Sequence, residues 1–161
     1  MSKEEKTNVM RILEDNDISF LPHEYPHGTD PVDGVTVARS MGQPLEAVFK
    51  TLVTRGSKGG TYVFVIPVDA ALDLKKAARA AGEKSMVLVP VKEITKLTGY
   101  VRGGCSPVGM KKKYPTFFAE EVVLTESIIV SAGKIGFQVE LSPDDLIPLV
   151  NGVIADVTVS S

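Results

Sequence analysis

Hydrophobic residues recur along this chain at two spacings, and each spacing predicts a different kind of element. Apolar residues three or four apart predict helices, which we expect at residues 2–16, 36–42, 72–81, 92–97 and 143–150. Short apolar runs predict strands, which we expect at residues 19–25, 47–54, 61–68, 86–89, 116–118, 128–130, 137–141 and 153–159. Helices and strands alternate irregularly, which favours an α+β fold with a mixed, curved sheet flanked by helices.

Residues at the ends of these segments carry their own signals. Ser2 with Glu5 fits a capping box at the start of the first helix, and Thr36 is the expected cap of the second. Gly82 follows the third helix, where a left-handed residue commonly ends a helix, and Ser142 precedes the last one. Together these signals fix most of the expected helix boundaries.

The overall composition is that of an ordinary globular protein. The chain has 161 residues, of which 43% are hydrophobic and 24% charged, so we expect one domain spanning residues 1–161. Its one cysteine, Cys105, cannot form an internal disulfide, and we find no signal peptide and no apolar run of ~20 residues. We therefore expect a cytoplasmic protein without membrane contact, and with two histidines we expect neither a metal nor a cofactor.

Charge is distributed unevenly along the chain. The net charge is −2, yet residues 50–113 contain 13 lysines and arginines against 4 aspartates and glutamates, a net charge of +9. Such a segment is typical of a face that contacts a polyanion, although solvated helix surface gives the same pattern. The residues expected on this basic face are Lys75, Lys76, Arg79, Arg102, Lys111, Lys112 and Lys113.

Lys50 is the most informative single charge. It stands mid-strand between Val48 and Leu52, and these three side chains share one face because a strand alternates with a period of two. A cation in an apolar strand costs free energy unless its head reaches water or a partner. Lys50 is therefore either an edge-strand lysine that discourages aggregation or an ammonium that holds an anion or polarises a carbonyl in a cleft.

A glycine-rich loop at residues 103–109 is a second candidate for chemistry. Gly103 and Gly104 expose backbone N–H groups that can form an oxyanion hole or bind a phosphate, although many glycine-rich turns do neither. Cys105 follows them and is a weak candidate for a nucleophile, since His23 and His27 are distant in sequence and most lone cysteines are buried fillers.

Four segments together resemble one known family. They are VFKTL at residues 48–52, LDLKK at 72–76, GGCSPVG at 103–109, and SAGK at 131–134 followed by Gly136, Pro143 and Leu146. In this order and spacing the chain resembles the YbaK/EbsC family of freestanding aminoacyl-tRNA deacylases, from about residue 14 to residue 156. That family is similar to the editing domain of bacterial prolyl-tRNA synthetase.

The resemblance implies a fold, an activity and partners. The fold is a mixed sheet curled towards a barrel and flanked by helices. The activity is trans-editing: cysteine, or alanine, wrongly attached to proline tRNA is removed and free tRNA is released. In the cysteine-specific members the thiol of the substrate attacks its own carbonyl and leaves as a cyclic thiolactone. The implied partners are aminoacylated proline tRNA and, as a candidate, prolyl-tRNA synthetase.

The resemblance also assigns residues. Lys50, Gly103 and Gly104 match the catalytic positions, and the substrate-binding positions are Tyr25, Thr51, Ser106, Pro107, Ser131, Gly133 and Gln138. Two features depart from the pattern: residues 31–33 lack a phenylalanine that some cysteine-specific members carry, and Gln138 replaces an aspartate. Two alternatives remain, a non-catalytic module that binds tRNA or a synthetase, and an unrelated enzyme that uses Lys50 as a Schiff-base amine.

Overall fold

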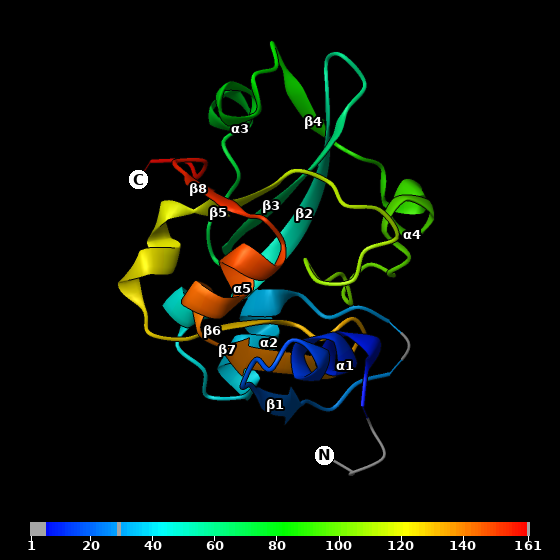
Figure 1. The fold of residues 1–161 in the computed structure, drawn as a ribbon, viewed down its shortest axis with the longest axis vertical. Coiled ribbons are helices and arrows are strands. Elements are labelled where there is room, and N and C mark those ends of the chain that lie inside the picture. Colours follow the sequence, from blue (N-terminus) through cyan, green and yellow to red (C-terminus); the bar gives the residue numbers. More distant parts are fainter. Residues whose placement is uncertain (1–5, 29, 161) are drawn as a thin grey trace.

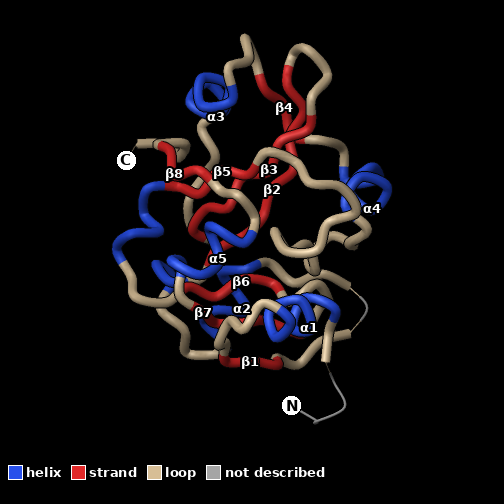
Figure 2. The backbone as a smooth tube through the Cα atoms, in the orientation of Figure 1, coloured by secondary structure: helices blue, strands red, loops and turns tan. Residues whose placement is uncertain are grey.

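The computed structural model describes residues 6–28 and 30–160, and within them eight strands form two sheets (Figures 1 and 2). The antiparallel three-stranded sheet has the order β1 (Leu21–Glu24), β7 (Phe137–Leu141), β6 (Ile128–Ser131). The five-stranded sheet has the order β4 (Met86–Leu88), β2 (Phe49–Gly56), β3 (Thr61–Pro67), β5 (Thr116–Ala119), β8 (Val153–Ala155). It is mixed, because β3, β5 and β8 run parallel while β2 is antiparallel to both its neighbours.

Two open sheets replace the single barrel-like sheet expected from the sequence. In the described residues a single bridge, between Val48 and Ile129, joins the two sheets. The five-stranded sheet does not close, because β4 pairs with β2 alone and β8 pairs with β5 alone. The α+β class and the mixed pairing are confirmed, and the closure into a barrel is not.

Five α-helices surround these sheets in the described part of the chain: α1 (Asn8–Asp15), α2 (Gly34–Ser40), α3 (Leu74–Ala81), α4 (Val91–Thr98) and α5 (Pro143–Leu149). Two 3₁₀ helices, Leu45–Ala47 and Glu120–Leu124, were not predicted. Figure 1 shows α3 and α4 on opposite sides of the β2–β3 hairpin, while α1 and α2 lie beside the three-stranded sheet.

The helix caps confirm some sequence signals and correct another. Gly82 ends α3 in the left-handed conformation with φ 73°, and the Ser142 side chain accepts the N–H of Asp144 at the start of α5, both as expected. The cap of α2 is Asp33, not Thr36, because the Asp33 carboxylate accepts both the N–H and the hydroxyl of Thr36. The capping box at residues 2 and 5 lies outside the described residues.

The apolar core has two main parts. The larger part packs α1 and α5 against β2, β3, β5, β6 and β7, around the fully buried side chains of Phe118, Leu13 and Leu146. The second part lies between α3 and the five-stranded sheet, around Phe64 and Ile66. Strand β3 contributes side chains to both parts, which explains its continuous hydrophobicity and confirms its predicted burial on both faces.

Candidate active site

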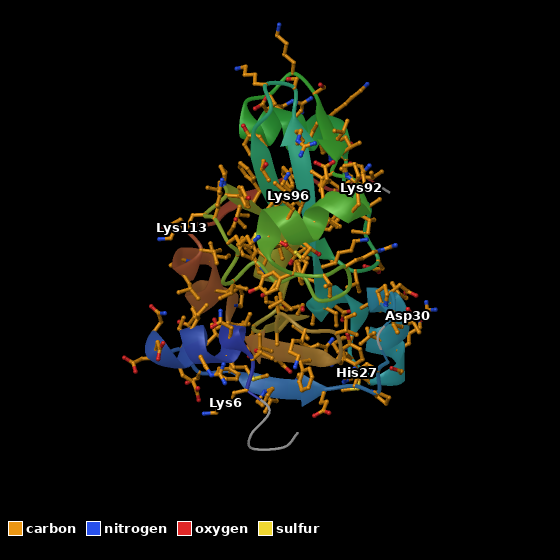
Figure 3. The ribbon with its side chains drawn as sticks, turned by 90° about the vertical axis from the view of Figure 1, so that its right-hand side faces the viewer. Lys6, His27, Asp30, Lys92, Lys96 and Lys113 are labelled. Carbon is orange, nitrogen blue, oxygen red and sulfur yellow. The ribbon has the colours of Figure 1, made fainter. Side chains whose placement is uncertain are left out.

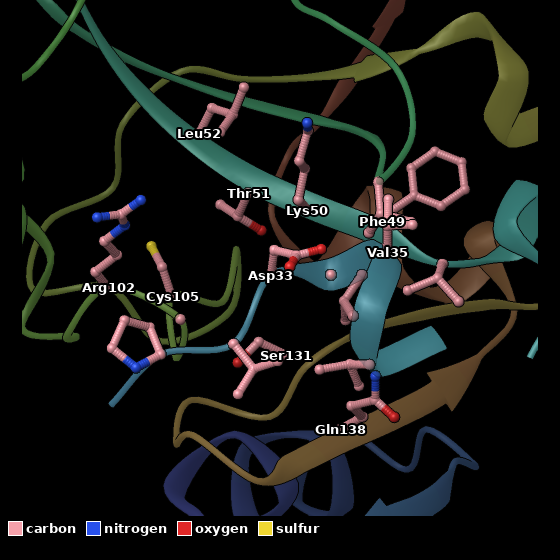
Figure 4. A pocket seen from close by; sticks show the side chains of 18 of the residues that line it. Asp33, Val35, Phe49, Lys50, Thr51, Leu52, Arg102, Cys105, Ser131 and Gln138 are labelled. Carbon is pink, nitrogen blue, oxygen red and sulfur yellow. The ribbon is translucent and has the colours of Figure 1, made fainter. Parts of the chain in front are cut away.

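A cavity of about 700 Å³ opens where β2 passes the three-stranded sheet (Figure 4). Its walls come from β2, β6, β7, the segment before α2, the loop at residues 102–105, and the β4–α4 region. Of the residues predicted for the site, those that line this cavity are Tyr25, Lys50, Thr51, Arg102, Gly103, Ser131 and Gln138. Residues separated by up to 113 positions in the sequence therefore meet at one place.

Strand β2 presents part of an unpaired edge to the cavity. On this side β6 bridges Val48, and β4 begins its pairing at Thr54, which leaves a gap at Thr51. The N–H of Val68 donates to the carbonyl of Val48, so alternation in an antiparallel pair turns the N–H and C=O of Thr51 away from β3 and towards the gap. Thr51 Oγ1 is also buried, and it has no hydrogen-bond partner in the described residues. Thr51 thus offers three polar atoms to a substrate.

Lys50 leaves β2 in the opposite direction to Thr51 (Figure 4). Its side chain is half-buried and lines the cavity between Val48 and Leu52, as the strand period predicts. Burial lowers the pKa of Lys50 below the usual 10.5, and the charge of Asp69 opposes this shift. None of the ion pairs formed within the described residues involves Lys50. Its ammonium is therefore a partly desolvated cation that can bind an anionic group of a substrate.

The glycine loop is shaped by close backbone contacts. Gly103 has φ +86°, and a Cβ there would lie 2.7 Å from Cβ of Pro31, so the cavity wall requires glycine at this position. The N–H of Gly104 donates to the carbonyl of Val101 at 2.9 Å, and Gly104 packs on the backbone of Ile135. Of the two glycines, Gly103 lines the cavity and Gly104 lies behind its wall.

Three other predicted residues also lie outside the cavity wall. Ser106 is fully buried and its hydroxyl accepts the N–H of Val108, and Pro107 is buried beside it. A Cβ at Gly133 would lie 3.0 Å from Tyr100 and from Val9, so Gly133 faces α1. These residues shape the loops around the site, and their predicted substrate contacts stay predictions.

The three-stranded sheet contributes amides and hydroxyls to the cavity. Ser131 and Gln138 are cross-strand neighbours of β6 and β7. The buried Gln138 accepts a hydrogen bond from Gln43 Nε2 at 2.9 Å, which fixes its carbonyl and leaves its NH₂ group for other contacts. Tyr25 is buried, and its N–H donates to the carbonyl of Gly136. These three residues therefore give this wall polar atoms but no charge.

Cys105 lines the cavity but is poorly suited to act as a nucleophile. Burial raises the pKa of its thiol to about 12, although a hydrogen bond with Thr98 opposes the shift. The reactive thiolate is therefore nearly absent at neutral pH. His23 is engaged with Glu140 at 2.8 Å, so this histidine is not free to serve as a base for Cys105.

Two walls of the cavity contain residues that were not among the predicted site residues. One is the segment at residues 31–35, which the sequence marked only by its missing phenylalanine; hydrogen bonds from Thr36 hold the pKa of the exposed Asp33 there below its usual range. The other is apolar and comprises Leu88, Val91 and Ile94. The sequence contained a signal for this wall. Strand β4 and the first turn of α4 carry more apolar residues than are needed to bury one face of each element.

The residues expected on one basic face fall into two groups. Lys75, Lys76 and Arg79 lie on α3, where Lys76 pairs with Asp156 at 3.0 Å and also donates to the carbonyl of Thr158. Lys111 donates to the carbonyl of Lys96 in α4, on the other side of the hairpin, and Arg102 lines the cavity. Figure 3 shows Lys113 apart from Lys92 and Lys96. The structure therefore divides the predicted basic face into two surfaces, because α3 and α4 cover opposite sides of the hairpin (Figure 1).

Within residues 6–28 and 30–160, no three His, Cys, Asp or Glu side chains form a group that could hold a metal ion. In the same residues no helix combines the length and the apolar character needed to cross a membrane.

Comparison with known proteins agrees with this geometry. EbsC of Enterococcus faecalis, a candidate Cys-tRNA(Pro)/Cys-tRNA(Cys) deacylase, is 45% identical over 155 residues, which cover 96% of this chain and 94% of EbsC. A solved structure of a candidate trans-editing enzyme for prolyl tRNA synthetase matches with a TM-score of 0.80 at 26% identity, covering 94% of this chain and 95% of that one. The crystal structure of the hypothetical protein APE2540 shares the fold, with a TM-score of 0.83 at 24% identity over 94% of this chain and 99% of that one. The model of the family described as "Aminoacyl-tRNA editing domain" matches residues 31–149, and the chain therefore belongs to the aminoacyl-tRNA editing domain family.

Proposed function

We propose that this protein is a trans-editing deacylase that removes cysteine from mischarged Cys-tRNA(Pro), acting as one domain in the cytoplasm, where charged tRNA is used. The observation that carries the proposal is the cavity in which Lys50, Thr51 and Gly103 meet, in a chain 45% identical to EbsC. Prolyl-tRNA synthetase is a candidate partner, because it forms the mischarged substrate.

The proposed reaction uses the thiol of the substrate. Its sulfur attacks the ester carbonyl, the C–S bond forms, and the bond between the carbonyl carbon and the ribose oxygen breaks. The ribose oxygen takes up a proton in place of the one that the thiol loses, so the products are a cyclic thiolactone and free tRNA. Water then opens the thiolactone to cysteine. No oxidant, reductant or enzyme nucleophile is needed, which fits the poor reactivity of Cys105.

The protein then has to position the ester and stabilise the developing negative charge. The N–H group and the hydroxyl of Thr51 are the donors available for a developing oxyanion, and Gly103 lines the same cavity. Lys50 adds a positive charge that binds either this oxyanion or the 3′-terminal phosphate. Because burial reduces competition from water, each such contact is stronger than it would be on the surface.

A comparison of charged tRNAs tests the proposal. Proline tRNA charged with cysteine, alanine, serine or proline is incubated with the protein, and loss of the ester is followed against the uncatalysed rate. We expect the cysteine ester to be cleaved fastest and thiolactone to form before free cysteine. If S-methylated cysteine on the same tRNA is cleaved equally fast, a water nucleophile replaces the substrate thiol in the mechanism. If no charged tRNA is cleaved but tRNA is bound, the protein is a non-catalytic module.

A further inference from the structure

An apolar strip runs along the cavity mouth and has no role in the chemistry proposed above. Leu88 at the end of β4 is 52% exposed, and Val91 at the start of α4 is 53% exposed, yet both line the cavity. Ile94, one turn further along α4, is half-buried in the same wall. Exposed aliphatic side chains that continue directly into a cavity are typical of a surface that a ligand covers.

Lysines surround this strip. Residues 91–113 contain six lysines and arginines against one acidic residue, Glu93. Glu93 is bound to Arg55 at 2.9 Å, so it does not neutralise the lysines beside it. Figure 3 shows Lys92 and Lys96 on the outward side of α4. Lys111 Nζ lies 3.5 Å from the carbonyl of Lys96, which places Lys111 against the end of the same helix.

Apart from Lys50, the cavity has less positive charge elsewhere. The wall at residues 31–35 contains the exposed carboxylate of Asp33. The basic residues of α3 lie on the far side of the hairpin, and Lys76 among them is held by Asp156. A polyanion whose end enters the cavity would therefore meet cations over α4 and an anion at the wall formed by residues 31–35.

We infer that this rim, defined as Leu88, Val91, Lys92, Lys96, Arg102 and Lys111, is the docking surface for the 3′ end of the charged tRNA. The inference rests on the proposed function, because an ester held at Thr51 needs its nucleotides to leave through the cavity mouth. The terminal base lies on Leu88 and Val91, and the phosphates that follow it lie along α4. Phosphates bind lysines without sequence preference, so this surface positions the tRNA and does not select it.

A pair of matched charge reversals tests this assignment. The double variant Lys92→Glu/Lys96→Glu alters the rim, and Lys75→Glu/Arg79→Glu makes the same change in charge on α3. All four positions lie on the exposed surface of a helix. We expect the rim variant to raise the KM for Cys-tRNA(Pro) by about tenfold or more, to leave kcat within about threefold, and to reduce the salt slope of binding by about 1 to 2. We expect the α3 variant to stay within about twofold of the wild type in all three.

Two further measurements separate this inference from the proposed function. Binding of uncharged tRNA is measured for both variants, so the rim is tested even if no ester is cleaved. The variant Leu88→Ser/Val91→Ser keeps every charge and is expected to weaken binding without changing the salt slope. Equal effects of the rim and α3 variants, or a larger effect of the α3 variant, would overturn the assignment. Thermal unfolding of each variant confirms that it is folded.

Discussion

Replacing Lys50 with alanine removes a half-buried ammonium from the cavity wall and leaves strand β2 able to form. The methylene stem packs between Val48 and Leu52, and losing it costs some apolar contact. The burial that lowers the pKa of Lys50 also means that its charge is poorly solvated, and removing that charge offsets the loss. We expect the free energy of unfolding to change by no more than about 1 kcal/mol.

The effect on activity is expected to be much larger. A lost electrostatic contact at the transition state costs about 10²-fold in rate, which corresponds to about 2.7 kcal/mol. The assay is single-turnover deacylation of Cys-tRNA(Pro) at several enzyme concentrations. If Lys50 binds the oxyanion, the maximal rate falls; if it binds the terminal phosphate, the concentration for half-maximal rate rises. Both results reduce kcat/KM by the same order.

Two variants serve as controls for Lys50→Ala. Lys50→Met keeps the stem and loses the charge, so we expect it to be as inactive as Lys50→Ala. Lys58→Ala removes an exposed lysine from the turn of the same hairpin and should keep full activity. The reasoning is refuted if Lys50→Ala retains the wild-type rate within about threefold, or if Lys50→Met is active and the stem alone is what matters.

Four further results are expected. Because the folded-state pKa of Lys50 lies below 10.5, the unfolded chain binds more protons than the folded chain at pH values between the folded and unfolded pKa. The free energy of unfolding of the wild type, measured by denaturant titration, should therefore rise with pH in that window relative to Lys50→Met. Parallel pH curves for the two proteins would contradict this. Cys105→Ser should deacylate Cys-tRNA(Pro) at a rate within a few-fold of the wild-type rate, and its inactivity would indicate an enzyme thiol mechanism. Iodoacetamide should alkylate Cys105 slowly at neutral pH, since burial raises the pKa of its thiol to about 12. Gly103→Ala should lose about tenfold or more in deacylation rate, because its Cβ meets Pro31. Gly59→Ala, where φ is +92° and the space around the glycine is open, should lose about 1 kcal/mol of stability and no activity. Equal rates for the two variants would show that the cavity wall does not need glycine at position 103. Ser142→Ala should lower stability by about 1 kcal/mol in thermal unfolding and leave the rate unchanged, and an unchanged melting temperature would show that this cap contributes nothing.

Local signals in the sequence predicted most of the elements. The β2–β3 hairpin, the left-handed glycine after α3 and the serine cap of α5 each depend on residues within a few positions of one another. The cap of α2 was misassigned for a local reason as well. Asp33 and Thr36 are both good caps, and Gly34 favoured a loop, whereas in the structure Asp33 caps and Thr36 donates to it.

What the sequence could not supply was the arrangement of distant segments. Pairing of β5 with β3 and of β7 with β1 joins strands about 50 and 110 residues apart, and no local pattern chooses such partners. The same limit applies to the predicted basic face, which the structure divides between α3 and α4. Clustering of charges in the sequence does not show which side of a sheet a helix covers. Of the predicted site, Lys50 and Thr51 were found through the strand pattern and the resemblance, while the rim at Leu88 and Val91 emerged only when β4 and α4 met the cavity.

The most direct test of the account is the rate at which the wild-type protein cleaves Cys-tRNA(Pro), measured beside its Lys50→Ala variant and beside proline tRNA charged with proline. The account predicts rapid cleavage of the cysteine ester, with thiolactone as the first product, slow cleavage by the variant, and no cleavage of the proline ester. If the folded wild-type protein binds tRNA but cleaves the cysteine ester no faster than buffer does, the account is contradicted.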